Sequence, residues 1–183
     1  MTAVPDNRSV ATKGRQSPRP VVVMGVAGCG KTVVGEALAA VLGSRFIEGD
    51  RLHPPANIER MSAGLPLTDE HRWAWLDAIG AKIAEAERGG VGAVAACSAL
   101  KRIYRDRLRS YSHRLLFVHL DIDKATAFRR VASRVGHFMP TSLVESQFAD
   151  LEPPGPDELA VRLDGTQTVD ELVAEAAAAL EVR

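Results

Sequence analysis

The sequence predicts an α/β fold in which a parallel β-sheet lies between two layers of helices. The run VVVMG at residues 21–25 is apolar without alternation, which is typical of a strand buried on both faces of a parallel sheet. Short apolar strands then alternate with amphipathic helices along the chain, and repeated β-α units favour a parallel sheet covered on both faces. A glycine-rich turn follows the first strand directly, as expected where a strand leads into a ligand-binding helix.

The local patterns place each element in turn. We expect strands at residues 21–25, 45–48, 92–97, 115–120 and 160–163, and helices at residues 31–42, 53–61, 68–88, from 99 onward, 124–134, 142–151 and from 168 onward. Gly43 is a plausible C-cap, and the prolines after His53 suit a first helical turn. Thr68 and Thr168 are expected N-caps, the second as a capping box with Glu171.

Length and composition exclude several classes of protein. The chain has 183 residues, of which 46% are hydrophobic, which fits one domain with a real core. The 23 basic residues cancel the 23 acidic ones, which disfavours a general nucleic-acid or membrane-surface binder. No apolar run approaches the roughly 20 residues of a membrane span. The two cysteines are too few for a disulfide framework, so a reducing, cytoplasmic location is expected.

Residues 1–20 differ from the rest of the chain. They are predominantly basic, contain three prolines and show no apolar periodicity. We interpret them as a disordered N-terminal tail, with a basic binding arm as the alternative. The folded domain is expected over residues 21–183.

The turn after the first strand satisfies the phosphate-loop pattern G-x-x-x-x-G-K-[ST], from Gly25 to Thr32. Its glycines let consecutive N–H groups point at phosphate oxygens, and the helix that follows adds the positive end of its dipole. Lys31 would reach the β- and γ-phosphates, and the Thr32 hydroxyl would bind Mg²⁺. Cys29 is read as a space-filler rather than a reactive thiol. The pattern predicts an ATP-type site in a three-layer α/β/α P-loop NTPase fold.

Two carboxylates follow the second strand, at Glu48 and Asp50. Ligands of open parallel sheets bind beyond the carboxyl ends of the strands, so both carboxylates are expected near the γ-phosphate. We assign Asp50 as the general base and Glu48 to the shell around Mg²⁺, with a solvated acidic loop as the alternative. The third strand ends in Cys97-Ser98 without a Walker-B aspartate, which argues against ATPase motors and GTPase switches.

Four segments carry a resemblance to a known family. In chain order they read GVAGCGKT, FIEGDRLHPPANIERMSAGLPLTDEHRWAWL, ACSALKRIYRDRLR and RVGHFMPTSLVESQFADLE. Together they resemble the gluconokinases of the small P-loop type, relatives of shikimate kinase and of the nucleoside monophosphate kinases. The likeness extends from about residue 21 to residue 180. It implies a nucleoside-monophosphate-kinase-like fold with a lid at about residues 134–141.

The resemblance implies that ATP phosphorylates D-gluconate at its 6-hydroxyl, with Mg²⁺ as cofactor and with a homodimer as a common assembly. The implied catalytic residues are Asp50, Lys31 and Arg134. The implied nucleotide contacts are Gly25, Val26, Ala27, Gly28, Cys29, Gly30, Lys31, Thr32, Arg130, Arg134 and Gln167. The implied substrate contacts are Asp50, His53, Asn57, Arg72, Ser98, Lys101, Arg105 and His137. Thr32 and Glu48 are the implied metal ligands.

Several of these residues also allow a structural interpretation. Arg72 and Arg105 suit surface ion pairs equally well, Asn57 suits a cap, and His53 suits a loop-stabilising role. From its spacing we expect Arg105 to share one flank of a helix with Lys101, away from the apolar face. Where the family pattern reads Asp-Arg-x-Pro-Trp-Leu, this chain reads HRWAWL from residue 71. The lost carboxylate and proline are expected to alter how Arg72 is held and to loosen the helix.

Two other functions remain open at this point. A related kinase would phosphorylate another sugar acid, shikimate or a nucleotide. A nucleotide-binding sensor without transfer activity would use the basic stretch at residues 101–114 to contact RNA. The tyrosines of that stretch fall on the apolar face of the predicted helix, which favours a core role over base stacking.

Overall fold

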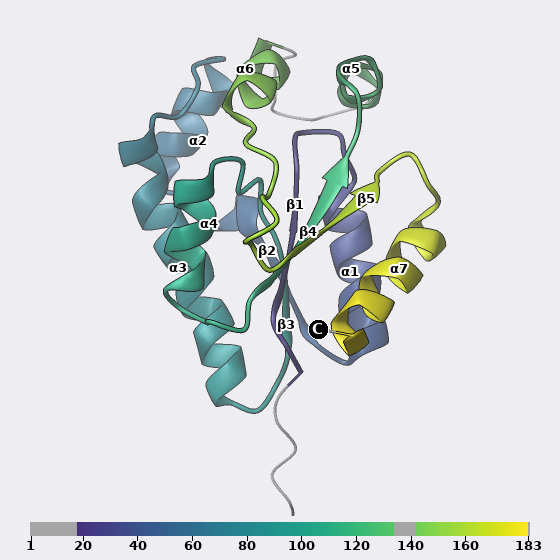
Figure 1. Cartoon of the computed structure of the whole chain (residues 1–183). Helices are drawn as coiled ribbons and strands as arrows, with labels where there is room; N and C mark the ends of the chain where they lie inside the picture. Colours follow the sequence, from purple (N-terminus) through teal and green to yellow (C-terminus); the bar gives the residue numbers. More distant parts are fainter. Residues whose placement is uncertain (1–17, 134–141, 183) are drawn as a thin grey trace, which may run out of the picture.

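The computed structural model of the chain describes residues 18–133 and 142–182 (Figure 1). Five parallel strands form one sheet in the order β2-β3-β1-β4-β5. The strands are β1 (Val21–Met24), β2 (Arg45–Glu48), β3 (Ala93–Ala96), β4 (Leu116–Asp121) and β5 (Ala160–Asp164). Because all five run in the same direction, their carboxyl ends meet at one edge of the sheet.

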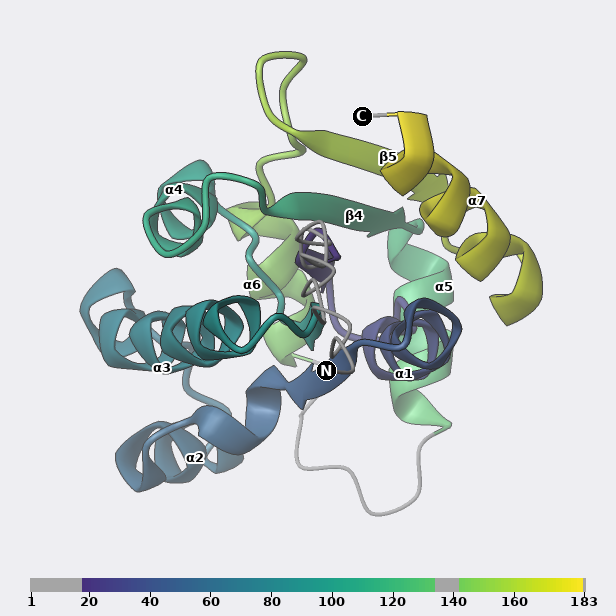
Figure 2. The same cartoon turned by 90° about the horizontal axis from the view of Figure 1, so that it is seen from below.

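The helices form layers on both faces of this sheet (Figure 2). One face is covered by α1 (Lys31–Leu42) and α7 (Val169–Val182), and the other by α3 (Asp69–Arg88) and α4 (Arg102–Arg109). Three further helices lie toward the carboxyl edge of the strands, namely α2 (Pro55–Ser62), α5 (Lys124–Ala132) and α6 (Ser142–Asp150) (Figure 1). The predicted α/β/α class is confirmed.

The apolar run of β1 packs into both layers. Val21 and Val23 belong to the core cluster on the α1 and α7 side, while Val22 and Met24 belong to the cluster on the α3 side. All four side chains are completely buried. A strand that faces a hydrophobic layer on each side has no need of polar alternation, which explains the pattern in the sequence.

The predicted caps are confirmed. Gly43 ends α1 in the left-handed conformation, at φ 59°. Thr68 begins α3 in a capping box that His71 completes, since the Thr68 N–H donates to the His71 ring. Thr168 begins α7, where its N–H donates to the Glu171 carboxylate at 2.9 Å.

Two local predictions need correction. The segment from residue 99 does not begin a helix: Ala99 has a φ of 42°, Lys101 is extended, and α4 begins only at Arg102. The packed body also begins before residue 21, because Pro20 is buried and its carbonyl accepts a hydrogen bond from the Leu116 N–H at 3.0 Å. A short 3-10 turn, η1 (Gly49–Leu52), follows β2 and was not predicted.

Candidate active site

A cavity of about 650 Å³ opens at the carboxyl edge of the sheet. It is bounded by the phosphate loop after β1, by η1 after β2, by the end of β3 and by one side of α6. The predicted site residues that line it are Ala27, Gly28, Gly30, Lys31, Thr32, Glu48, Asp50, His53, Arg72 and Ser98. The cavity therefore brings the phosphate loop together with half of the expected substrate contacts, namely Asp50, His53, Arg72 and Ser98.

The phosphate loop has the backbone shape that its glycines allow. Gly25, Gly28 and Gly30 have positive φ angles of 138°, 85° and 103°. A Cβ on Gly28 would lie 2.9 Å from the Ala127 carbonyl oxygen of α5, so no larger residue fits there. The loop ends at the first turn of α1, whose N-terminus favours negative charge. The geometry suits a chain of phosphates.

Lys31 lies inside this loop. Its ammonium donates to the Val26 carbonyl oxygen at 3.0 Å. The loop is joined to the neighbouring strand because the Gly25 N–H donates to the Ser98 carbonyl oxygen at 3.3 Å. These contacts place the end of β3 directly beside the phosphate loop. Val26 and Cys29, in contrast, are buried beneath the loop, at 2% and 1% exposure.

The two carboxylates after β2 lie on a rigid support. Glu48 caps η1, where its side chain accepts a hydrogen bond from the Asp50 N–H at 3.4 Å. Gly49 lies so close to β3 that a Cβ would come within 2.2 Å of the Ala96 carbonyl oxygen. Its own carbonyl accepts from the indole N–H of Trp75 at 2.7 Å. Asp50 is exposed and lines the cavity.

The His53 ring is held by Trp75 and Asn57. It stacks on Trp75 with centroids 4.2 Å apart, and burial lowers its pKa to about 4, against a smaller opposing effect of Asp50. The Asn57 amide nitrogen donates to the His71 carbonyl oxygen at 2.7 Å and lies 3.4 Å from His53 Nδ1. An amide nitrogen only donates, so Nδ1 is the acceptor. The neutral ring therefore carries its proton on Nε2.

Arg72 is nearly buried and lines the cavity. It is 7% exposed, and its Nη2 donates to the Leu67 carbonyl oxygen at 3.2 Å and lies 3.7 Å from the Asp150 carboxylate. Its guanidinium also lies over the Tyr104 ring, at 5.3 Å. Among the described residues, its Nε–H has no acceptor. Arg72 thus carries a buried donor that no described residue satisfies.

The departures from the family pattern have structural answers. His71 completes the cap of α3, and Asp150 of α6 supplies a carboxylate to Arg72. The helix runs without a break from Asp69 to Arg88, although Ala74 replaces the expected proline. The prediction that the helix is loosened at this point is wrong.

Lys101 lies in a second hollow beside the cavity, of about 420 Å³, which shares Pro66, Leu67 and Ser146 with it. Its ammonium donates to Asp69 at 2.8 Å and lies 3.5 Å from Asp150. The hydrogen bond to Asp69 raises the pKa of Lys101 above its ordinary range. Tyr104 also donates to the Asp69 carboxylate.

The substrate contact expected at Arg105 needs correction, because the structure places this side chain away from the cavity. The side chain is 1% exposed and forms a two-bond ion pair with Glu158, each bond 2.7 Å long. Its Nη1 donates to the carbonyl oxygens of Ala99, Leu100 and Glu152. Burial alone would raise the pKa of Glu158, but hydrogen bonds from Arg105 and Arg109 lower it to about 2. Arg105 ties the chain around residue 152 to α4.

Asn57 also departs from its expected place. It is 3% exposed and does not line the cavity. Its side-chain amide donates to the His71 carbonyl oxygen and to the His53 ring. Asn57 therefore acts on the site through the orientation of the His53 ring.

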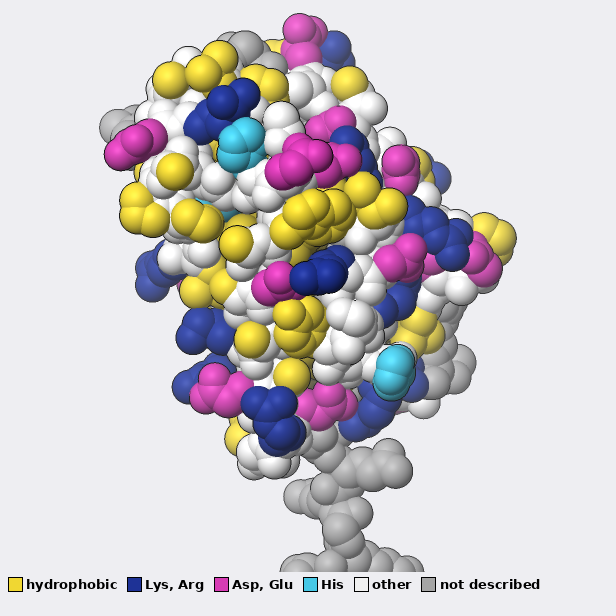
Figure 3. All heavy atoms as spheres, turned by 90° about the vertical axis from the view of Figure 1, so that its left-hand side faces the viewer, with side chains coloured by type: hydrophobic (Ala, Val, Ile, Leu, Met, Phe, Trp, Pro, Cys, Tyr) yellow, Lys and Arg dark blue, Asp and Glu magenta, His cyan; other side chains and the backbone are white. Residues whose placement is uncertain are grey.

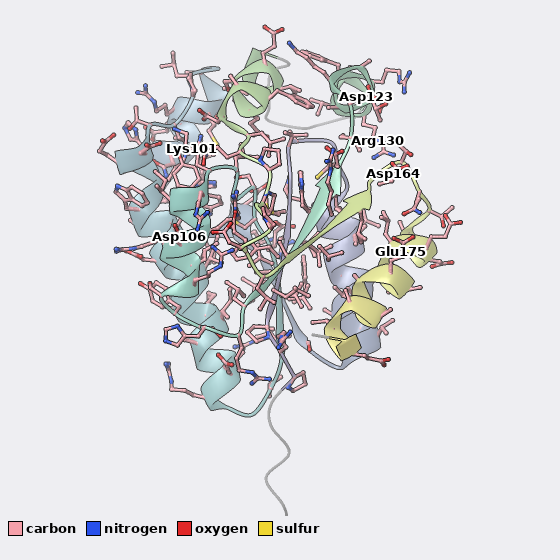
Figure 4. All side chains as sticks on the ribbon, viewed as in Figure 1. Lys101, Asp106, Asp123, Arg130, Asp164 and Glu175 are labelled. Carbon is pink, nitrogen blue, oxygen red and sulfur yellow. The ribbon has the colours of Figure 1, made fainter. Side chains whose placement is uncertain are left out.

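The residues expected around the adenine lie together on the other side of the phosphate loop. Arg130 of α5 donates to the Gly165 carbonyl oxygen at 2.9 Å and to that of Gly28 at 3.4 Å. Figure 4 shows Arg130 beside Asp164, at the end of β5. The Gln167 amide donates to Glu175 at 2.9 Å, and its buried oxygen has no partner among the described residues. Arg134, His137 and the predicted lid at residues 134–141 lie outside the described residues.

Three residues of α6 that the sequence analysis did not indicate line the cavity, namely Leu143, Ser146 and Gln147. The Gln147 side-chain oxygen accepts a hydrogen bond from the Ala27 N–H of the phosphate loop at 2.7 Å. Nothing in the sequence pattern marks a glutamine within a helix as a partner of a loop 120 residues earlier. A long-range side-chain contact of this kind needs the fold.

The residues present are compatible with Mg²⁺. Within residues 18–133 and 142–182, no three His, Cys, Asp or Glu side chains are grouped to hold a metal ion. Mg²⁺ needs no such group, because one or two protein oxygens suffice when phosphates and water supply the rest. Thr32, Glu48 and Asp50 all line the cavity.

The basic stretch at residues 101–114 is largely neutralised by acidic partners. Its ion pairs are Lys101–Asp69, Arg102–Asp157, Arg105–Glu158, Arg107–Asp77, Arg109–Asp106 and Arg114–Glu87. Figure 3 shows basic and acidic side chains interspersed over the left-hand side of the molecule in Figure 1. Tyr104 is fully buried, as expected for a core residue. No described helix is both long and apolar enough to cross a bilayer.

Comparison with known proteins decides the family. A gluconokinase of Gluconobacter oxydans is 49% identical over 158 residues, which cover 86% of this chain and 89% of that protein. The chain belongs to the gluconokinase family. The thermosensitive gluconokinase of Escherichia coli is 46% identical over 145 residues, covering 78% of this chain and 77% of that protein. The shikimate kinase family also matches, over residues 27–152.

Solved structures agree with this assignment. A gluconokinase from Sinorhizobium meliloti has a TM-score of 0.81 and 48% identity, covering 91% of this chain and 94% of that one. An unliganded sugar kinase from Janibacter has a TM-score of 0.85 and 44% identity, covering 89% and 94%. The chain is therefore a kinase of the P-loop kinase fold, a phosphotransferase with an alcohol group as acceptor.

Proposed function

We propose that this chain transfers the γ-phosphoryl group of ATP to the 6-hydroxyl of D-gluconate, giving 6-phospho-D-gluconate and ADP. One observation carries the proposal: a single cavity holds a phosphate loop, an exposed carboxylate at Asp50, and the buried Arg72 guanidinium, whose Nε–H has no acceptor among residues 18–133 and 142–182. Gluconate has an alcohol at one end and a carboxylate at the other. The cavity offers a suitable group to each end.

On the nucleotide side, the loop amides and Lys31 are proposed to hold the β- and γ-phosphates. The Lys31 ammonium has three N–H donors, so the one that binds the Val26 carbonyl oxygen leaves others for phosphate oxygens. Arg130 lies between the phosphate loop and Gly165 and is proposed to contact the adenine. Gln167, two residues after Gly165, is proposed as a second nucleotide contact. Mg²⁺ would be held by Thr32 with Glu48 in its outer shell, where it neutralises charge on the phosphates.

On the acceptor side, Asp50 is the proposed general base, because it lines the cavity on a turn fixed by Glu48 and Trp75. Proton removal by a positioned carboxylate strengthens the hydroxyl as a nucleophile. His53 stays neutral and offers its Nε2–H as a donor to a hydroxyl oxygen of the polyol. Arg72 is the proposed partner of the gluconate carboxylate. Ser98, which lines the cavity, and Lys101, in the adjoining hollow, are proposed to bind further oxygens.

A coupled assay of ADP release tests the proposal. We expect release that requires both D-gluconate and Mg²⁺ and that disappears in Lys31→Ala. An acceptor panel with shikimate, other sugar acids and nucleoside monophosphates separates the related kinases. A strong preference for shikimate, whose kinase family also matches this chain, would overturn the assignment to gluconate. We further propose a cytoplasmic location and a homodimeric assembly, which fractionation and light scattering would test.

A further inference from the structure

We propose that Gln147 is a positioning residue, which fixes the Val26–Ala27 peptide of the phosphate loop against α6 and keeps it fixed when ATP is bound. The expected effects on kcat and KM rest on the proposed phosphoryl transfer, whereas the structural role of Gln147 does not. That role concerns one hydrogen bond, from the Ala27 N–H to the Gln147 side-chain oxygen, 2.7 Å long.

The peptide that joins Val26 to Ala27 is held at both ends. Its carbonyl oxygen accepts from the Lys31 ammonium at 3.0 Å and from the Cys29 N–H at 3.3 Å. Its N–H donates to Gln147. The orientation of this one peptide therefore depends on partners from two different parts of the chain.

The geometry separates Gln147 from the phosphate side. A planar trans peptide points its N–H and its carbonyl oxygen in opposite directions, and the chain has no cis peptide bond among its described residues. The carbonyl oxygen faces Lys31, the residue that must reach the phosphates. The N–H, and with it Gln147, consequently faces away from Lys31, toward α6. Gln147 does not compete with a phosphate oxygen for this donor.

The contact is expected to matter most once ATP binds. The Lys31 ammonium has three N–H donors, so it then also donates to phosphate oxygens, which weakens its hold on the Val26 carbonyl oxygen. Gln147 holds the other side of the same peptide. Without it, the loop can rotate this peptide at the moment when the γ-phosphoryl must face the acceptor.

The same helix also touches the acceptor side. Three residues after Gln147, Asp150 lies 3.7 Å from the Arg72 guanidinium and 3.5 Å from the Lys101 ammonium. Val144, fully buried, anchors the helix in the core. One rigid element thus contacts both the phosphate loop and the cations of the acceptor side. This arrangement fixes the distance between donor and acceptor groups, which phosphoryl transfer requires.

Two substitutions test the role. Gln147→Met keeps the length of the side chain and removes its strong acceptor, whereas Gln147→Glu keeps an acceptor and adds a negative charge. One hydrogen bond changes a rate about 2- to 10-fold, so we expect Gln147→Met to lower kcat by that factor with little change in KM for ATP. Gln147→Glu should raise KM for ATP through charge repulsion. Glu145→Gln, exposed on the same helix, is the matched control and should change neither constant.

Amide hydrogen exchange at Ala27, measured by NMR with a non-hydrolysable ATP analogue bound, gives a readout that is independent of turnover. We expect protection in the wild type, in Gln147→Glu and in Glu145→Gln, and about 2- to 10-fold faster exchange in Gln147→Met. Equal exchange in Gln147→Met and wild type would overturn the proposal. Tighter binding of the analogue by Gln147→Met would also overturn it, because Gln147 would then be a competitor of phosphate. A wild type inactive on gluconate would instead refute the proposed function and leave the exchange result valid.

Discussion

Replacing Arg72 with methionine removes the guanidinium from the cavity and keeps a side chain of similar length. Arg72 is 7% exposed, and its Nε–H has no acceptor among the residues that the structure describes. A buried donor without a partner is unfavourable, so a ligand that accepts from it binds with an added gain. The proposed ligand group is the carboxylate of gluconate.

The magnitude follows from the charge on both partners. A hydrogen bond to a charged group contributes about 1.5–3 kcal/mol. Since about 1.4 kcal/mol corresponds to a factor of ten, Arg72→Met should lower kcat/KM for D-gluconate by about 10- to 150-fold. KM for ATP should change little, because the phosphate loop lies on other elements. Asp150 keeps Lys101 as a cationic neighbour at 3.5 Å in this variant.

The assay compares D-gluconate with D-glucitol, a polyol of the same length without a carboxylate. In the wild type, gluconate should be strongly preferred. In Arg72→Met, activity on gluconate should fall to the level of the polyol, while activity on the polyol stays as in the wild type. An undiminished preference for gluconate in Arg72→Met would refute the assignment of its carboxylate to Arg72.

Three further results are expected. Asp50→Asn should bind an ATP analogue normally but lose about 10²–10⁴ in kcat, and a near-normal rate would remove Asp50 as the base. Glu158→Gln leaves Arg105 and Arg109 without their buried counter-ion and should cost about 3–5 kcal/mol in urea unfolding at pH 7. The pKa of Glu158 is about 2 in the folded protein and 4.5 in its ordinary state. Its contribution to the free energy of unfolding should therefore disappear as pH falls from about 4.5 to 2. A free energy of unfolding that does not change across this pH range would contradict the role of Glu158. The pKa of His53 is about 4 rather than 6.5, so the free energy of unfolding of the wild type should decrease as pH falls from 6.5 to about 4. For the same reason, the pH profile of kcat/KM for gluconate should show no inflection near pH 6.5 from protonation of His53.

Much of the fold could be predicted because its determinants are local. The unbroken apolar run of β1 requires a strand with a hydrophobic layer on each face, and the structure divides its four side chains between two core clusters. The phosphate loop is likewise contained in eight consecutive residues, so its place between β1 and α1 follows from the sequence. Glu48 and Asp50 reach the cavity because β2 ends at the same edge of the sheet.

The wrong prediction for Arg105 has a specific cause. Spacing places Lys101 and Arg105 on one helical flank only if both lie within the helix. Ala99 adopts a φ of 42° and Lys101 is extended, so α4 begins at Arg102 rather than at residue 99. The carbonyl oxygens of Ala99 and Leu100 accept hydrogen bonds from Arg105, which is held in the interior. The non-helical backbone before Arg102 therefore changed the direction expected for this side chain.

Gln147 and Asp150 could not be found from the sequence. Both lie on α6, within a segment that resembles the gluconokinases, but the resemblance did not single them out, and their partners at Ala27 and Arg72 are far away along the chain. The contact between Asp150 and Arg72 likewise becomes visible only when the packing of α6 is known.

The central claim is that Asp50 faces the terminal phosphate across the acceptor hydroxyl. A crystal structure of the wild type with D-gluconate, Mg²⁺ and a non-hydrolysable ATP analogue measures this directly. We expect an Asp50 oxygen within hydrogen-bonding distance of the 6-hydroxyl, with that hydroxyl in line with the γ-phosphorus. Asp50 turned to solvent, or gluconate bound with its carboxylate toward the phosphates, would contradict the account.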